Sequence, residues 1–105
     1  MTGDYAIVWL NEALADLEDL RAFYAADVGI EFGFEAHDEV LNQIAGLSFM
    51  PMRTRMGRIK GTREYVLERF PYVAILRVLE DHVEILGLIH TSRRYPTQDL
   101  LKRLQ

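Results

Sequence analysis

The segment 87–96, GLIHTSRRYP, brings together side chains that could take part in acid–base or phosphate chemistry. His90 can act as an acid or a base near neutral pH, because the reference pKa of histidine is about 6.5. Arg93 and Arg94 can hold phosphate oxygens, and Tyr95 can stack on a nucleobase or donate a proton. Three interpretations are open: an active site, a docking surface for a charged partner, or the end of a strand where His90 bonds locally.

A second group of cations lies in PMRTRMGRIKG (51–61) and just after it. These positive side chains are Arg53, Arg55, Arg58, Lys60 and Arg63. They fit either a solvated loop and edge strand, where charge discourages aggregation, or a binding surface for an acidic partner. Gly57 and Gly61 do not follow a strand and open a helix, so they indicate turns or bulges and not a phosphate-binding loop.

The composition excludes several classes of site. The absence of cysteine excludes disulfides, thiolate catalysis and cysteine-ligated zinc. His37, His82 and His90 have no spacing that indicates a metal site, and we expect no cofactor. There is no signal-peptide pattern and no apolar run long enough to span a bilayer, so we expect a cytoplasmic protein without a membrane partner.

Charge is distributed unevenly along the chain. Residues 1–52 contain ten acidic residues and one basic residue, Arg21, whereas residues 53–105 contain eleven basic and six acidic residues. The two halves therefore carry −9 and +5, which gives the net charge of −4. Such asymmetry indicates either a charged partner or attraction between the two halves within one fold.

The length of 105 residues suits one domain, 1–105, with a single modest core. Residue patterns predict strands at 5–10, 58–60, 63–70, 72–80 and 83–90, and helices at 12–27, 32–47 and 97–105. We expect Asn11 and Thr97 to be N-caps, and Gly29 to end the first helix. The predicted fold is α+β: an antiparallel helical hairpin packed on a small, mostly antiparallel sheet, with a short C-terminal helix.

The helices contain more large apolar side chains than a small core needs. We expect Leu14, Leu17, Leu20 or Arg21, Tyr24 and Val28 to form the buried face of the first helix, with Glu12, Asp16 and Asp19 as an acidic stripe away from it. Most of the helix-associated aromatic residues, Phe23, Tyr24, Phe32, Phe34 and Phe49, should be core. Because two helices on one sheet cannot hide all of them, a residual apolar groove should suit an amphipathic helix of a partner.

Several segments together resemble the RelE/ParE superfamily of type II toxin–antitoxin toxins. These segments are IVWLNEALADLEDLRAFY, LNQIAGLSFMP, GRIKGTREYVLERFPYVAILRV and VEILGLIHTSRRYP, which cover nearly the whole chain. The motifs in these segments resemble those of ParE toxins more closely than those of RelE toxins. The resemblance implies a toxin that is neutralised by a cognate, ParD-like antitoxin and that inhibits DNA gyrase. The alternative is a ribosome-dependent mRNA endoribonuclease of the RelE type.

Residue roles follow from these two alternatives. A ribonuclease would use His90, Arg63 and Tyr95 as its catalytic residues, with arginines on the phosphate. A binding toxin would use the cations and His90 to contact its target. We favour target binding by Arg58, Lys60, Arg63, His90, Arg93, Arg94 and Tyr95, and antitoxin binding by Leu17, Phe23, Tyr24 and Phe34.

Overall fold

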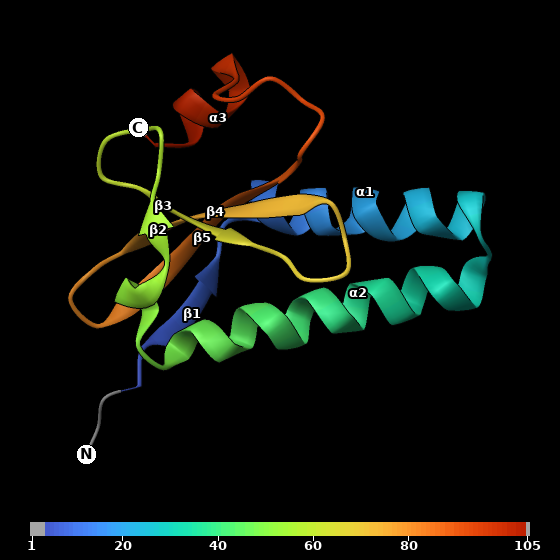
Figure 1. Cartoon of the computed structure of the whole chain (residues 1–105), viewed down its shortest axis with the longest axis horizontal. Coiled ribbons are helices and arrows are strands. Elements are labelled where there is room, and N and C mark those ends of the chain that lie inside the picture. The colour runs from blue at the N-terminus through green and yellow to red at the C-terminus, as the bar shows by residue number, and fades with distance from the viewer. Residues whose placement is uncertain (1–3, 105) are drawn as a thin grey trace.

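The computed structural model describes residues 4–104 and contains one sheet and three α-helices in that part of the chain (Figure 1). The elements in order are β1 (Ala6–Trp9), α1 (Asn11–Asp27), α2 (Ile30–Ala45), the 3-10 turns η1 (Gly46–Ser48) and η2 (Pro51–Arg53), β2 (Arg55–Met56), β3 (Arg63–Val66), β4 (Tyr72–Val78), β5 (His82–His90) and α3 (Gln98–Arg103). The predicted α+β architecture is confirmed.

The five strands lie in the order β1-β5-β4-β3-β2. Strands β2 to β5 pair antiparallel as consecutive neighbours, and β1 pairs with β5 in parallel. A parallel pair needs a long crossover, and the segment from α1 to β4 supplies it. His90 therefore ends a strand with neighbours on both sides, as the apolar run VEILGLIH predicts.

The two long helices form the predicted antiparallel hairpin (Figure 1). Gly29 has a positive φ of 154° at the turn between them, a conformation that a side chain would strain. Gly33 allows the helices to approach closely, because a Cβ atom there would lie 2.7 Å from the Arg21 carbonyl oxygen and 2.9 Å from the Ala25 Cβ atom.

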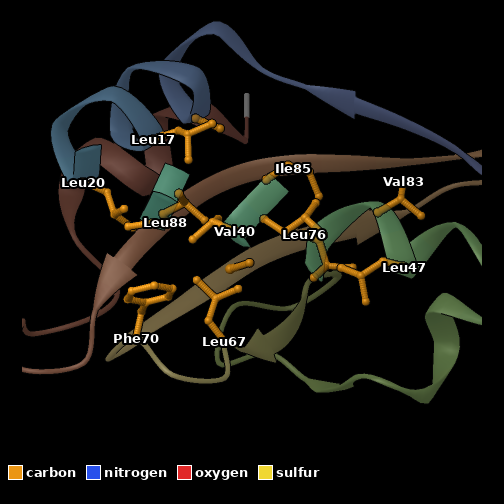
Figure 2. Packing of buried hydrophobic residues seen from close by; sticks show 14 residues of the cluster. Leu17, Leu20, Val40, Leu47, Leu67, Phe70, Leu76, Val83, Ile85 and Leu88 are labelled. Atoms are coloured by element: carbon orange, nitrogen blue, oxygen red, sulfur yellow. The ribbon is translucent and has the colours of Figure 1, made fainter. Parts of the chain in front are cut away.

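The hairpin covers one face of the sheet and encloses the main core there. Figure 2 shows Leu17, Leu20 and Val40 from the helices meeting Leu76 and Leu88 from the strands. All five side chains are buried, and burial of each contributes roughly 1.5–3 kcal/mol relative to exposure.

The short C-terminal helix packs on the other face of the sheet. Leu100 joins Ile75, Leu86 and Ile89 in a second, smaller cluster. Thr97 is the N-cap of α3, as predicted, because its hydroxyl oxygen accepts a hydrogen bond of 3.1 Å from the Leu100 amide. The sheet thus has helices on both faces.

Several local predictions were wrong. Leu10, and not Asn11, is the N-cap of α1, and no side chain caps that helix. The short edge strand lies at Arg55–Met56, whereas residues 58–60 form a turn. Strand β3 ends at Val66 and not at residue 70, because the chain turns before Pro71, with Arg69 at a positive φ of 76°.

The buried face of the helices is also narrower than predicted. Leu14 and Val28 are exposed. Phe23, Phe34 and Phe49 are exposed as well, so most of the helix-associated aromatic residues lie outside the core. Only Tyr24 and Phe32 pack against it. Among residues 4–104, no helix has the length and apolarity needed to cross a membrane.

Candidate functional site

His90 lies at the end of β5 on the face that the hairpin covers. Its ring meets the Tyr72 ring edge-on, with centroids 5.0 Å apart, and the two residues are register partners across β4 and β5. The Ser92 backbone amide donates to His90 Nδ1 at 3.0 Å, and the Ser92 hydroxyl lies 2.8 Å from the same atom. Because Nδ1 accepts a hydrogen bond, the neutral ring carries its proton on Nε2.

A pocket of about 350 Å³ opens beside this histidine, between α1 and the ends of β4 and β5. It is lined by Asp16, Asp19, Leu20, Phe23, Tyr72, Leu88, His90, Ser92 and Arg93. The wall from α1 is acidic, and the wall from the loop after β5 carries the cation of Arg93. The pocket can therefore accept a small polar or charged group between two walls of opposite sign.

Tyr95 lies on the opposite face of the sheet. It packs against the cluster beneath α3, and its hydroxyl group is buried. Arg58 stacks over its ring at 5.1 Å and donates to its carbonyl oxygen at 3.4 Å. Burial, together with the neighbouring carboxylate of Glu64, raises the pKa of Tyr95 to about 12.

Glu64 is the buried anion of this arginine-rich region. Its side chain is 3% exposed and accepts from Arg55 at 2.8 Å and from the Arg58 backbone amide at 3.1 Å. Burial by itself would raise the pKa of Glu64, but the neighbouring Tyr95 hydroxyl and the hydrogen bonds from the Arg58 amide and Arg55 together lower it. A carboxylate therefore lies under the cations and offsets part of their charge.

The Arg63 guanidinium is occupied by hydrogen bonds within the protein. Its guanidinium donates to the Thr54 hydroxyl at 3.1 Å, to the Met52 carbonyl at 2.8 Å and to the Thr54 carbonyl. These bonds fix the segment between η2 and β2 against the edge of the sheet. Arg63 therefore has a structural role as the side-chain anchor of that segment.

The remaining predicted target-binding residues are exposed. Lys60 lies in the turn after β2, and Arg93 and Arg94 lie in the loop after β5. Arg93 borders the larger pocket beside His90. It also borders a smaller pocket of about 120 Å³, which His90, Arg58 and Tyr95 line as well. His90 and Tyr95 thus pack on opposite faces of the sheet, but both border the smaller pocket, where Arg58 and Arg93 join them.

The predicted antitoxin-binding residues lie on α1 and α2, but only some reach the surface. Leu17 is 2% exposed and belongs to the core. Phe23 and Phe34 are exposed, and the Arg21 guanidinium lies 5.2 Å from the centre of the Phe34 ring. Tyr24 is half-buried and meets Phe23 edge-on at 5.2 Å.

One pair in this region is not evident in the sequence. Asp16 was expected in a solvated acidic stripe, but it lies beside β5 and pairs with Arg103 of α3 at 2.7 Å. The contact of Arg103 with Asp99 has the i,i+4 spacing that a helix allows. The contact with Asp16 crosses 87 residues, and no local pattern predicts it.

No group of three or more histidine or acidic side chains within residues 4–104 is arranged to hold a metal ion.

Comparison with known proteins gives consistent results. A family model described as the ParE toxin of the type II toxin–antitoxin system, parDE, matches residues 7–95. The chain is 32% identical over 90 residues to "Putative toxin Y4kP" of Sinorhizobium fredii, a match that covers 86% of this chain and 92% of that protein. A solved structure described as a chromosomal ParDE TA system from P. aeruginosa superposes with a TM-score of 0.81 at 25% identity, covering 87% of this chain and 100% of the other.

Proposed function

The chain belongs to the ParE toxin family of type II toxin–antitoxin systems, and on this premise we propose that it arrests growth by binding and inhibiting DNA gyrase. In this proposal a ParD-like antitoxin neutralises it. The chain acts as a protein-binding toxin and not as an enzyme, and it needs no cofactor.

His90 and Tyr95 border one small pocket, but the observation that carries the proposal is that the Tyr95 hydroxyl and the Arg63 guanidinium are not free to act on a phosphate beside His90. A ribonuclease needs its acid, its base and its phosphate-binding cations within hydrogen-bond reach of one phosphate. Here the His90 ring lies beside Tyr72 on the hairpin face, whereas the Tyr95 hydroxyl is buried on the other face. The Arg63 guanidinium is occupied by the 52–54 segment.

The charge beneath the arginines supports the same conclusion. The ionised Glu64 carboxylate lies among Arg55, Arg58 and Tyr95. A negative charge in that position weakens attraction for RNA phosphates. It is compatible with a protein partner, which is recognised through individual ion pairs and apolar contacts.

The target-binding surface that we propose consists of the exposed cations around the end of β5. Arg93 and Arg94 reach outward from the loop, and Arg58 stacks on Tyr95 with its backbone held in place. Lys60 lies nearby in sequence on the turn after β2. Such a group of arginines beside an aromatic ring is typical of residues that dominate binding energy at interfaces.

The antitoxin surface that we propose lies on the hairpin and is centred on Phe23 and Phe34, with Tyr24 at its inner edge. Leu17 is left out because it is buried. Exposed aromatic side chains on two adjacent helices suit an amphipathic helix, which can place its apolar face over them.

A second candidate function is a ribosome-dependent mRNA endoribonuclease. The observation in its favour is the pocket beside His90, whose lining also includes Asp16, Asp19 and Arg93. An imidazole next to a carboxylate and a guanidinium could move a proton and hold a phosphate.

An assay on purified components separates the two functions. The toxin is released from its antitoxin, refolded and added to purified gyrase with relaxed plasmid, and in parallel to translating ribosomes with a defined message. We expect supercoiling to stop while the message stays intact. Cut mRNA with unaffected supercoiling would place the nuclease first.

A further inference from the structure

We propose that a second apolar surface, far from the hairpin turn, contacts an acidic and apolar region of the toxin's protein target. We call it the methionine surface and define it as Phe49, Met50, Met52 and Met56. The proposal rests on the proposed function only in that the toxin acts by binding a protein, and it holds whichever protein that is.

The methionine surface is exposed to an unusual degree for its chemistry. Its four side chains are between 57% and 70% exposed. They lie within eight consecutive residues, from η1 through η2 to the edge strand β2. Single exposed apolar residues need no explanation, but a group of this kind indicates an interaction site. Methionine suits such a site, because its flexible thioether adapts to the shape of a partner.

The backbone beneath these side chains is held firmly. Pro51 is buried, and the Thr54 hydroxyl donates to the Pro51 carbonyl at 2.7 Å. Arg63 holds the carbonyls of Met52 and Thr54. Met50 has a positive φ of 53°, a conformation that non-glycine residues keep only where the surroundings impose it. A surface that is already ordered loses less entropy on binding than a flexible loop.

The charge around this surface selects the partner. Residues 46–63 contain five cations and no acidic residue. Arg53 and Lys60 are exposed, and Glu64 is buried. One exposed acidic residue, Asp4, forms a backbone bridge with Phe49 at the edge of the surface. Exposed thioethers and an aromatic ring among cations fit a protein region with both carboxylates and apolar side chains. A nucleic-acid backbone would leave the methionines without a partner.

The hairpin has the opposite charge. Residues 11–45 contain nine acidic residues and one basic residue, Arg21. The hairpin turn and the β2 edge lie at opposite ends of the longest dimension of the molecule, 40 Å (Figure 1). A partner that complements the acidic hairpin does not complement the basic methionine surface. We therefore assign the turn end of the hairpin, which carries Phe23 and Phe34, to the antitoxin and the methionine surface to the target.

The test measures growth arrest and antitoxin binding for each of four variants. The variants are Met52→Ser with Met56→Ser, and Arg53→Glu, with Arg53→Lys and Leu14→Ser as controls. Leu14 is an exposed apolar residue on α1, outside both surfaces that we define. All are substitutions of exposed residues and should fold, which antitoxin binding at wild-type affinity then demonstrates.

We call the variant with Met52→Ser and Met56→Ser the double-serine variant. We expect this variant and Arg53→Glu each to raise the toxin level needed for growth arrest about tenfold or more, while their affinity for the antitoxin stays unchanged. Arg53→Lys and Leu14→Ser should behave like the wild type. If the double-serine variant arrests growth as strongly as the wild type, the proposal is wrong. Weaker antitoxin binding with unchanged arrest would also contradict it, because the surface would then belong to the antitoxin.

Two further outcomes separate the sources of failure. If Arg53→Glu weakens growth arrest but the double-serine variant does not, the partner at this surface is a nucleic acid and not a protein. Purified gyrase tests the proposed function separately. If the wild type never inhibits supercoiling but the two methionine-to-serine substitutions still prevent growth arrest, gyrase is the wrong target, and the assignment of the surface to a target is supported.

Discussion

Arg103 and Asp16 form an ion pair over the backbone of Gly87, with Arg103 Nη1 2.7 Å from Asp16 Oδ2. The pair lies at a bulge in β5, where the register with β4 shifts between Ile75 and Leu76. Arg103 Nη1 donates to the Leu86 carbonyl at 2.9 Å, and the Leu88 amide donates to Asp16 Oδ2 at 3.0 Å. The ion pair thus bonds to backbone groups of β5 beyond Ile85, the last residue of β5 that pairs with β1, and it ties α1 and α3 to one strand.

Replacement of Arg103 by methionine should lower the free energy of unfolding by about 2–4 kcal/mol, because it leaves the Asp16 carboxylate and the Leu86 carbonyl without their partner. Urea denaturation at neutral pH measures the change. Glu18→Gln is the matched control, since it breaks the exposed pair with Arg21 and should leave the urea midpoint where it is. Equal effects of the two variants would show that Arg103 behaves as an ordinary surface cation.

Replacement of Gly87 by alanine should destabilise the fold through the same pair. The added Cβ atom would lie 2.6 Å from Arg103 Nη1 and 3.1 Å from Asp16 Oδ2. We expect a loss of about 1–3 kcal/mol in the wild-type background. In the Arg103→Met background the loss should be much smaller, because the clashing guanidinium is absent. Additive effects in this double-mutant cycle would contradict the proposed coupling.

The sequence predicts the elements of this fold well, because their signals are local. Alternating and helical spacing locate β5, β4 and the hairpin, and Thr97 predicts the cap of α3. The prediction of a central strand ending at His90 follows from an apolar run bounded by polar residues. These features depend on residues within a few positions of one another.

Features that depend on distant contacts were not predictable in this way. The spacing of Leu14 is helical, but the position of the sheet relative to α1 decides that Leu14 is exposed while Leu17 is buried. The segment GLIHTSRRYP predicts one cluster, and the fold keeps part of it: His90 and Tyr95 pack on opposite faces of the sheet but border one small pocket with Arg93. Arg63 reads as a free cation, and only the folded 52–54 segment reveals its carbonyl partners.

Tyr95→Phe should change the response to alkaline pH. The folded-state pKa of Tyr95 is about 12, above the value of about 10 in an unfolded chain. Between these values the unfolded state has lost the proton and the folded state keeps it. The stabilising contribution is therefore complete below about pH 10 and is lost as the pH rises through about 12.

Two measurements test this assignment. Tyrosinate absorbance, as the difference between the wild type and Tyr95→Phe, should show one group that titrates near the top of that range. At neutral pH we expect the variant to lose at most about 1 kcal/mol, because the ring and its stacking with Arg58 remain. Growth arrest should also persist. A difference titration near pH 10 would mean that the hydroxyl is in water, and loss of arrest in a folded variant would restore Tyr95 as a candidate acid.

Substitutions at the end of β5 should distinguish binding from catalysis. If the exposed guanidinium groups contact a protein target, Arg93→Ala and Arg94→Ala should each weaken growth arrest, and the double variant should weaken it further, because rim cations contribute in increments. His90→Gln should do comparatively little, since glutamine can still accept the hydrogen bond from the Ser92 amide. Loss of a general acid or base would instead lower a reaction rate by about 10²–10⁴-fold. A His90→Gln protein that folds and binds its antitoxin normally, but no longer arrests growth, would move the endoribonuclease ahead of the gyrase inhibitor.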